Sequence, residues 1–161
     1  MKVTYPIRTD NGDEYLILIE SFEKTVFPEE IISALGSIEI MDITLERLSG
    51  SQTTNLNVLF DISSFIAGFL NDNENVILYF YCDDMHEISR RNRSVTAQKF
   101  RSALFSKMFD RYIKSRNITG FFNTPLEIKA DRDIYIHLIS REEHCYLVEI
   151  IKNAIIGLAS K

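Results

Sequence analysis

The stretch from Cys82 to Arg101, CDDMHEISRRNRSVTAQKFR, concentrates residue types that could do chemistry. Its first half supplies Asp83, Asp84 and His86, which are ligand types for a divalent metal ion. Consecutive aspartates on an extended chain point to opposite sides, so they would not chelate one ion without a kink. The spacing matches no defined metal motif, so we predict no metal and no other cofactor. A metal-dependent hydrolase at this loop is kept as an alternative.

The second half of the stretch offers chemistry for anions. Arg90, Arg91 and Arg93 come just before a predicted helix, and Arg101 lies within its first turns. Guanidinium groups at the start of a helix could clamp an oxyanion or a phosphate. No glycine occurs from position 84 to 99, whereas a P-loop or a Rossmann turn needs glycines to bring its backbone close to phosphate. Both nucleotide motifs are excluded, and a group-transfer enzyme using the arginines is a further alternative.

The charge of the chain is distributed unevenly. The segment 90–116 holds nine of the 18 cations and, in Asp110, one of the 23 acids, so it carries +8 while the remainder carries −13. In one interpretation this segment attracts nucleic acid or a phosphate-bearing ligand. In the other, which we favour, the acidic remainder neutralises it internally. The sequence pI of about 5.2 and the lack of a recognisable nucleic-acid-binding motif also count against nucleic acid.

The elements that must position these residues follow from periodicity and turn signals. The Asn11-Gly12 turn predicts a hairpin at the N-terminus, and a second hairpin is predicted near the C-terminus. Strands are predicted over 2–8, 14–21, 37–48, 76–82, 120–130 and 133–140. Helices are predicted over 27–36, 55–70, 96–116 and 141–159. The segment 55–70 could instead begin as a strand, because short apolar runs are ambiguous.

This order of elements, β-β-α-β-α-β-α-β-β-α, predicts the fold class. We expect a single α+β domain over residues 1–161, with terminal hairpins and with helices packed on an antiparallel or mixed sheet. The run 76–82 is continuously apolar, which is typical of a central strand. The strand 37–48 changes its alternation near Met41 and Asp42, which predicts a bulge or exposure on one side only.

The predicted helix 96–116, with Ser94 or Thr96 as its N-cap, has a wide apolar face. Arg101 falls in the middle of that face, where an unpaired charge would be very costly. We therefore predict that Arg101 is buried and bonded to Asp83 or Asp84. On the opposite side, toward solvent, we expect Lys99, Lys107, Asp110 and Lys114. We expect His137, on a strand, and His144, in the first turn of the last helix, to be structural histidines with satisfied hydrogen bonds. Cys82, at the end of a buried strand, is expected to be a small core residue.

The segment YCDD…RRNRSVTAQKFRSALFSKMFDRY resembles a family of small uncharacterised bacterial proteins of the Bacteroidota. In that family an apolar strand ending near Cys-Asp is followed by an Arg-Asn-Arg stretch and an aromatic-rich helix. The resemblance implies a bacterial origin and assigns no catalytic residue.

The sequence as a whole favours a binding protein. No segment is apolar enough to span a bilayer or to act as a signal peptide, and the two cysteines give no disulfide framework, so a cytoplasmic protein is expected. Seven Tyr and 11 Phe could populate an interface, so a protein partner or self-association as a homodimer is the first hypothesis. Nucleic-acid or phosphate binding through 90–116 is the second, an enzyme at 82–101 is the third, and no catalytic residue is predicted.

Overall fold

The computed structural model describes residues 2–8, 14–49, 56–82, 96–129 and 133–159. Six of the seven candidate site residues lie outside these ranges, and Arg101 is the one inside them. The six are Asp83, Asp84, His86, Arg90, Arg91 and Arg93. The Asn11-Gly12 turn also lies outside the described residues.

The described strands form one mixed sheet with the order β1-β2-β3-β4-β6-β5. The strands are β1 (Lys2–Arg8), β2 (Glu14–Ser21), β3 (Glu39–Ser49), β4 (Val76–Tyr81), β5 (Phe121–Ile128) and β6 (Ile134–Arg141). Only β3 and β4 pair in parallel; every other neighbouring pair is antiparallel. A parallel pair requires a crossover, and a helix between β3 and β4 supplies it. Both predicted hairpins are therefore confirmed.

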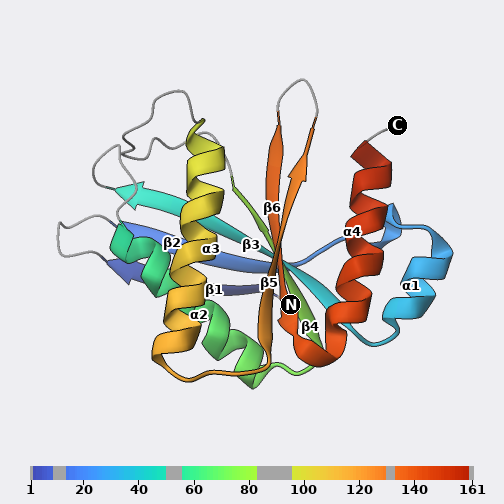
Figure 1. Cartoon of the computed structure of the whole chain (residues 1–161), viewed down its shortest axis with the longest axis horizontal. Coiled ribbons are helices and arrows are strands. Elements are labelled where there is room, and N and C mark those ends of the chain that lie inside the picture. Colours follow the sequence, from blue (N-terminus) through green and yellow to red (C-terminus); the bar gives the residue numbers. More distant parts are fainter. Residues whose placement is uncertain (1, 9–13, 50–55, 83–95, 130–132, 160–161) are drawn as a thin grey trace.

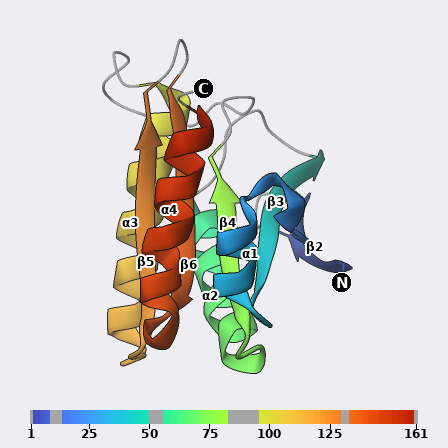
Figure 2. The same cartoon turned by 90° about the vertical axis from the view of Figure 1, so that its right-hand side faces the viewer.

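Helices cover both faces of the sheet. They are α1 (Glu29–Leu35), α2 (Leu56–Asp72), α3 (Ala97–Ser115) and α4 (Cys145–Ala159), with short 3-10 turns at Lys24–Val26 and Glu142–His144. The pair α2 and α3 lies on one face, and the pair α1 and α4 lies on the other (Figure 1, Figure 2). The predicted α+β class and the order of elements are confirmed, and the segment predicted over 55–70 is helical from Leu56 onward. Within the described ranges, no helix is long and apolar enough to cross a membrane.

Two apolar cores result, one under each helix pair. Leu78 of β4 belongs to the core beneath α2 and α3, while its neighbour Ile77 belongs to the core beneath α1 and α4. Alternate residues of a strand point to opposite faces, so a strand buried on both sides must be apolar at every position. This explains why β4 reads as an uninterrupted apolar run.

Strand β3 changes from two-sided to one-sided burial along its length. Ile40 packs toward α1 and α4, and Met41 and Ile43 pack toward α2 and α3. Beyond Ile40, the first of these faces holds the half-buried Asp42 and the exposed Thr44. The prediction of exposure on one side is therefore correct from this point on. The alternative of a bulge at Met41 is wrong, since the register shift lies between Glu14 and Tyr15 of β2.

Each edge strand of the sheet contains a proline. Among the described strands, β1 with Pro6 pairs with β2 alone, and β5 with Pro125 pairs with β6 alone. Proline has no N–H to donate, so each residue removes one hydrogen-bond donor from an edge. Such edges are poor templates for pairing with a strand of another chain.

Candidate functional site

A chain of polar side chains joins α3 to the β5–β6 hairpin. His137 of β6 is 0% exposed, and its Nε2 lies 2.9 Å from Ser102 Oγ on α3. Its Nδ1 lies 2.9 Å from Asn123 Oδ1 on β5, and Asn123 Nδ2 donates to Ser106 Oγ at 3.1 Å. These four residues, which we call the polar chain, run from the core toward the surface.

The bonds of the polar chain assign the hydrogen of its histidine ring. With the Asn123 amide oxygen facing His137 Nδ1, Nδ1 carries the ring hydrogen and Nε2 accepts from the Ser102 hydroxyl, because an amide oxygen can only accept. Burial lowers the pKa of His137 from 6.5 to about 4, because the charged form would lose its hydration. The ring is therefore neutral near pH 7.

The order Ser102, His137, Asn123 matches that of a nucleophile, its base and an orienting group. A nucleophile must meet substrate, however, and Ser102 is only 7% exposed while His137 is not exposed at all. This arrangement fastens α3 to the sheet, and His137 is bonded at both nitrogens, as expected of a structural histidine.

His144 departs from that expectation in two ways. It lies in the 3-10 turn before α4 and not in the first turn of the helix itself. Its Nδ1 is buried and has no hydrogen-bond partner within the described part of the chain. The prediction of a fully bonded His144 is therefore wrong.

A groove of about 550 Å³ runs between the second half of α3 and the first half of β5. We call it the α3–β5 groove. Ser106 and Asn123, the outer members of the polar chain, both line it and are partly exposed. Its apolar lining consists of Phe109, Ile113, Ile118, Phe121, Phe122 and Pro125. The groove thus combines apolar walls with polar groups that converge at one place.

The end of α3 shapes one end of this groove. Asn117 has a φ of 52°, and the backbone N–H of Ile118 donates to Ile113 O at 3.0 Å while that of Asn117 donates to Lys114 O at 3.2 Å. These are the two bonds of a Schellman motif, in which a left-handed residue stops the helix. The motif turns the chain so that Ile118 and Ile113 both line the groove.

Helix α3 presents the basic part of the chain to solvent. Lys99, Lys107, Asp110 and Lys114 are exposed as predicted, and Asp110 pairs with Lys114 at 3.0 Å. Neither Lys107 nor Arg111 forms an ion pair with any described residue. Arg111 is exposed, whereas Arg101 is only 4% exposed. Of these two arginines, Arg101 is therefore the one whose charge needs a partner in the folded protein.

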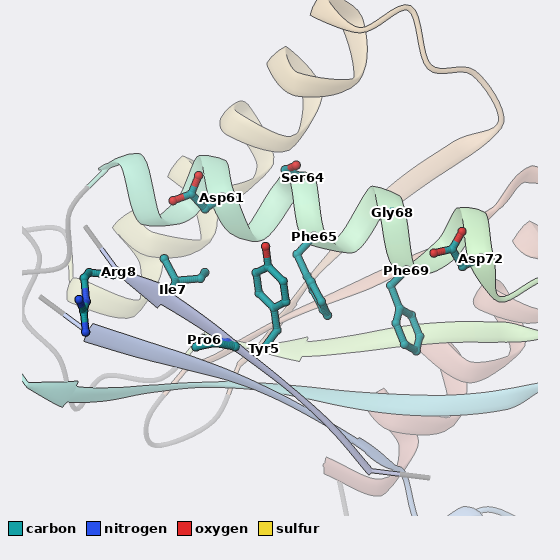
Figure 3. A pocket seen from close by; sticks show the side chains of 10 residues that line it. All are labelled: Tyr5, Pro6, Ile7, Arg8, Asp61, Ser64, Phe65, Gly68, Phe69 and Asp72. Carbon is teal, nitrogen blue, oxygen red and sulfur yellow. The ribbon is translucent and has the colours of Figure 1, made fainter. Parts of the chain in front are cut away.

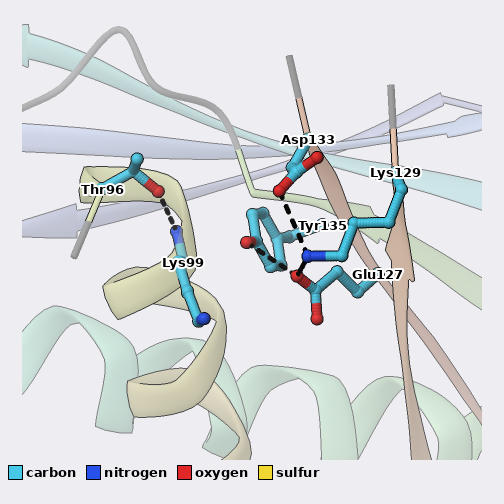
Figure 4. A network of polar contacts seen from close by, with 6 residues as sticks. All are labelled: Thr96, Lys99, Glu127, Lys129, Asp133 and Tyr135. Atoms are coloured by element: carbon cyan, nitrogen blue, oxygen red, sulfur yellow. Dashed lines mark hydrogen bonds and ion pairs between the residues drawn. The ribbon is translucent and has the colours of Figure 1, made fainter. Parts of the chain in front are cut away.

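At its first turn α3 lies close to acidic side chains (Figure 4). Thr96 caps the helix by accepting from the backbone N–H of Lys99 at 3.3 Å, as predicted. Across from it, Lys129 and then Tyr135 donate to Glu127, and with a smaller effect of Lys99 they lower the pKa of the Glu127 carboxyl. Partial neutralisation thus occurs at the first turn of α3, whereas no described acidic side chain pairs with Lys107 or Arg111.

A second groove, of about 500 Å³, lies between β1 and α2 (Figure 3). Phe65 and Phe69 point from α2 toward the sheet, and the Tyr5 ring lies 4.7 Å from that of Phe65. The polar residues on α2 are spread along the helix, and Arg8 is already bonded to Glu14 at 2.7 Å. Because its polar groups do not converge, this groove is the weaker candidate.

The predicted site at 82–101 is described only at its two ends. Cys82 is buried and forms no disulfide, consistent with the expected core role. Arg101 is buried as predicted, but its pairing with Asp83 or Asp84 involves residues outside the described ranges and stays a prediction. The described residues contain no group of three or more His, Cys, Asp or Glu side chains that could hold a metal ion.

Comparison with known proteins gives no match: no family model, no curated protein and no solved structure matches this chain. The Bacteroidota resemblance therefore stays a prediction. Sequence reasoning missed the polar chain and the groove. One signal did exist, because His137 interrupts the apolar run 134–139 and must find partners there.

Proposed function

We propose that this protein is a bacterial, cytoplasmic binding domain without catalytic activity, and that it takes an apolar segment of a protein partner into the α3–β5 groove. The observation that carries this proposal is the groove itself. Its volume of about 550 Å³ falls within the usual range for ligand sites. Most of its lining comes from α3 and β5, two elements of regular structure.

The composition of the groove supports a protein partner. Its centre is apolar, and Asp110 and Lys114 form an ion pair at its rim. An apolar centre within a polar rim is the usual anatomy of a protein interface. Phe122, which is 45% exposed, extends the apolar surface beyond the groove.

The sheet edges are less suited to association. Pro6 and Pro125 remove donors from the two edge strands, so extension of the sheet by a second copy is disfavoured. The proposed occupant is therefore a side-chain-bearing segment that enters the groove, and not a strand added to the sheet. Formation of a homodimer through the groove would be an alternative outcome of the test below.

Peptide selection with two matched variants tests the proposal. A phage-displayed random peptide library is panned on the purified protein, and the selected peptides are titrated against Ile118→Ser and Ile156→Ser. Ile118 lines the groove, whereas Ile156 is exposed on α4 across the sheet. We expect peptides with aromatic or aliphatic side chains whose affinity falls by about tenfold in Ile118→Ser alone, since burying one large apolar side chain contributes about 1.5–3 kcal/mol. Peptides that bind both variants like the wild type would contradict the proposal.

The exposed cations of α3 favour a second candidate, nucleic-acid binding. Lys107 and Arg111 lie one helical turn apart, and neither forms an ion pair with a described residue. Fluorescence anisotropy with labelled single-stranded DNA and RNA would measure this activity, and its affinity must fall steeply as salt rises. The double variant Lys107→Ala/Arg111→Ala should weaken it, whereas Lys2→Ala/Arg8→Ala, which removes the same charge from β1, should not. Binding that is independent of salt or equal in both double variants would exclude this candidate.

A further inference from the structure

We infer that the α3–β5 groove recognises a neutral carbonyl group beside an apolar group, through hydrogen bonds from Ser106 Oγ–H and Asn123 Nδ2–H. This inference rests on the proposed function, and it adds the chemistry of the occupant. It would suit an extended peptide, since every residue of a peptide carries a backbone carbonyl next to its side chain.

The first step is to count the hydrogen-bond donors of the two residues. Asn123 Nδ2 has two hydrogens, and one of them is donated to Ser106 Oγ. Asn123 Oδ1 is engaged with His137 Nδ1, which keeps the amide in this orientation. Ser106 Oγ accepts from Asn123, so its own hydrogen is directed elsewhere. Within the described part of the chain neither remaining hydrogen has an acceptor, and both residues line the groove.

The second step is the electrostatics of the groove at Ser106 and Asn123, which we call its floor. His137 is buried and neutral, so the polar chain presents dipoles and no positive charge to the groove. Lys114 lies at the rim, but Asp110 pairs with it at 3.0 Å. A carboxylate that left water for this floor would lose much of its hydration without meeting a free cation. A neutral carbonyl loses far less and accepts the same two hydrogen bonds.

The third step is the position of the apolar walls. Phe109 and Ile113 come from α3, and Phe121 precedes Asn123 by two positions on β5, so that both residues lie on the same face of that strand. An occupant whose carbonyl bonds Asn123 therefore has an apolar wall directly beside it. The carbonyl sets the register of the occupant, and the apolar contact supplies most of the affinity.

The experiment uses three probes of matched shape, titrated into the whole protein labelled with ¹⁵N and followed by NMR. Ethylbenzene carries no acceptor, acetophenone carries a neutral carbonyl, and benzoate carries a carboxylate. We expect acetophenone to bind about fivefold more tightly than ethylbenzene, the gain typical of a neutral hydrogen bond, and benzoate to bind more weakly than acetophenone. Ser106→Ala removes one of the two donors, so it should reduce the advantage of acetophenone and leave ethylbenzene binding unchanged. Ser115→Ala, an exposed Ser→Ala change on the same helix, should have no effect.

The outcomes separate this inference from the proposed function. Equal binding of acetophenone and ethylbenzene at the groove would overturn the inference and leave the proposed function standing. Failure of every probe to shift groove signals would overturn both. Preferred binding of benzoate would overturn the assignment of a neutral occupant. In the same samples the ¹⁵N shifts of His137 must show hydrogen on Nδ1; hydrogen on Nε2 would reverse the Asn123 amide and remove the donor on which the inference depends.

Discussion

Arg101 of α3 and His137 of β6 are both ionisable and both buried, but the cost of burial is offset differently for each. Arg101 stays charged at any ordinary pH, so its 4% exposure requires compensation by a partner. His137 can give up its proton, and its two hydrogen bonds satisfy the neutral ring. The first residue is therefore sensitive to loss of its partner, and the second is sensitive to pH.

Replacing Arg101 by methionine should destabilise the fold by about 3 kcal/mol, because the change leaves the partner of a buried charge uncompensated. Urea unfolding of Arg101→Met would measure this loss. A double variant that also replaces Asp83 or Asp84 with an apolar residue should recover much of it, if the predicted pairing is correct. Arg111→Met, at an exposed position of the same helix, should change stability by no more than about 0.5 kcal/mol. An Arg101→Met variant as stable as the wild type would exclude a structural role for Arg101 and favour one in ligand binding.

Stability should fall in acid because of His137. Its pKa of about 4 in the folded protein lies below its ordinary value of 6.5, so the unfolded chain takes up a proton first as the pH falls. The stabilisation is complete above about pH 6.5 and is lost progressively toward pH 4, by on the order of 3 kcal/mol. Urea unfolding at several pH values in this window, for the wild type and for His137→Gln, would measure the effect. The variant should lose less stability than the wild type, and equal losses would refute the assignment.

At the scale of elements, helix α2 is stabilised at its C-terminal end by hydrogen bonds from β6, whereas a glycine near that end lowers its stability. Arg141 of β6 donates to the carbonyl oxygens of Leu70 at 2.6 Å and Asn71 at 3.2 Å, which no helical N–H can reach. Gly68, two positions before Leu70, is exposed and has open space where a Cβ would stand. Glycine in a helix costs conformational entropy that alanine does not.

Gly68→Ala should therefore stabilise the protein by about 0.5–1 kcal/mol. Thermal or urea unfolding would measure the gain. Gly120 provides the matched control, because its φ of 87° is a conformation that a side chain disfavours. Gly120→Ala should destabilise the protein. A loss of stability in Gly68→Ala would mean that the open space beside α2 is needed by the fold.

At the scale of the whole molecule, the helices cover the two faces of the sheet. Pairing with strands of other chains must therefore be limited by the edge strands themselves. Both edge strands carry a proline, and β1 is also exposed over most of its length. This arrangement favours contacts through the grooves and helices over pairing of strands between copies. Association of this protein should therefore depend on the identity of residues 6 and 125.

Pro6→Val should increase self-association, because valine restores an edge donor and favours the strand. Light scattering at micromolar concentrations would compare the variant with the wild type, and Pro125→Val should act in the same direction. Pro28→Val, which lies at the start of α1 and away from the edges, is the control. If the wild type already dimerises and neither edge variant changes its mass, the edges have no part in association.

The sequence alone determined the elements and their order. Asn11-Gly12 predicted the first hairpin, the continuous run 76–82 predicted a central strand, and the periodicity of 96–116 predicted both α3 and the burial of Arg101. These features depend on local rules, since turn residues, side-chain alternation and helical spacing act within a few positions.

Only the tertiary structure decided the candidate site. Ser102 and His137 are 35 positions apart, and Asn123 and His137 are 14 apart, so no local pattern connects them. Their contact requires that β5 and β6 pair in one register and that α3 docks on the face bearing His137. A shift of one residue in that register would turn Asn123 to the opposite face. The groove depends on the same docking, because its walls come from two elements that meet only in the folded chain.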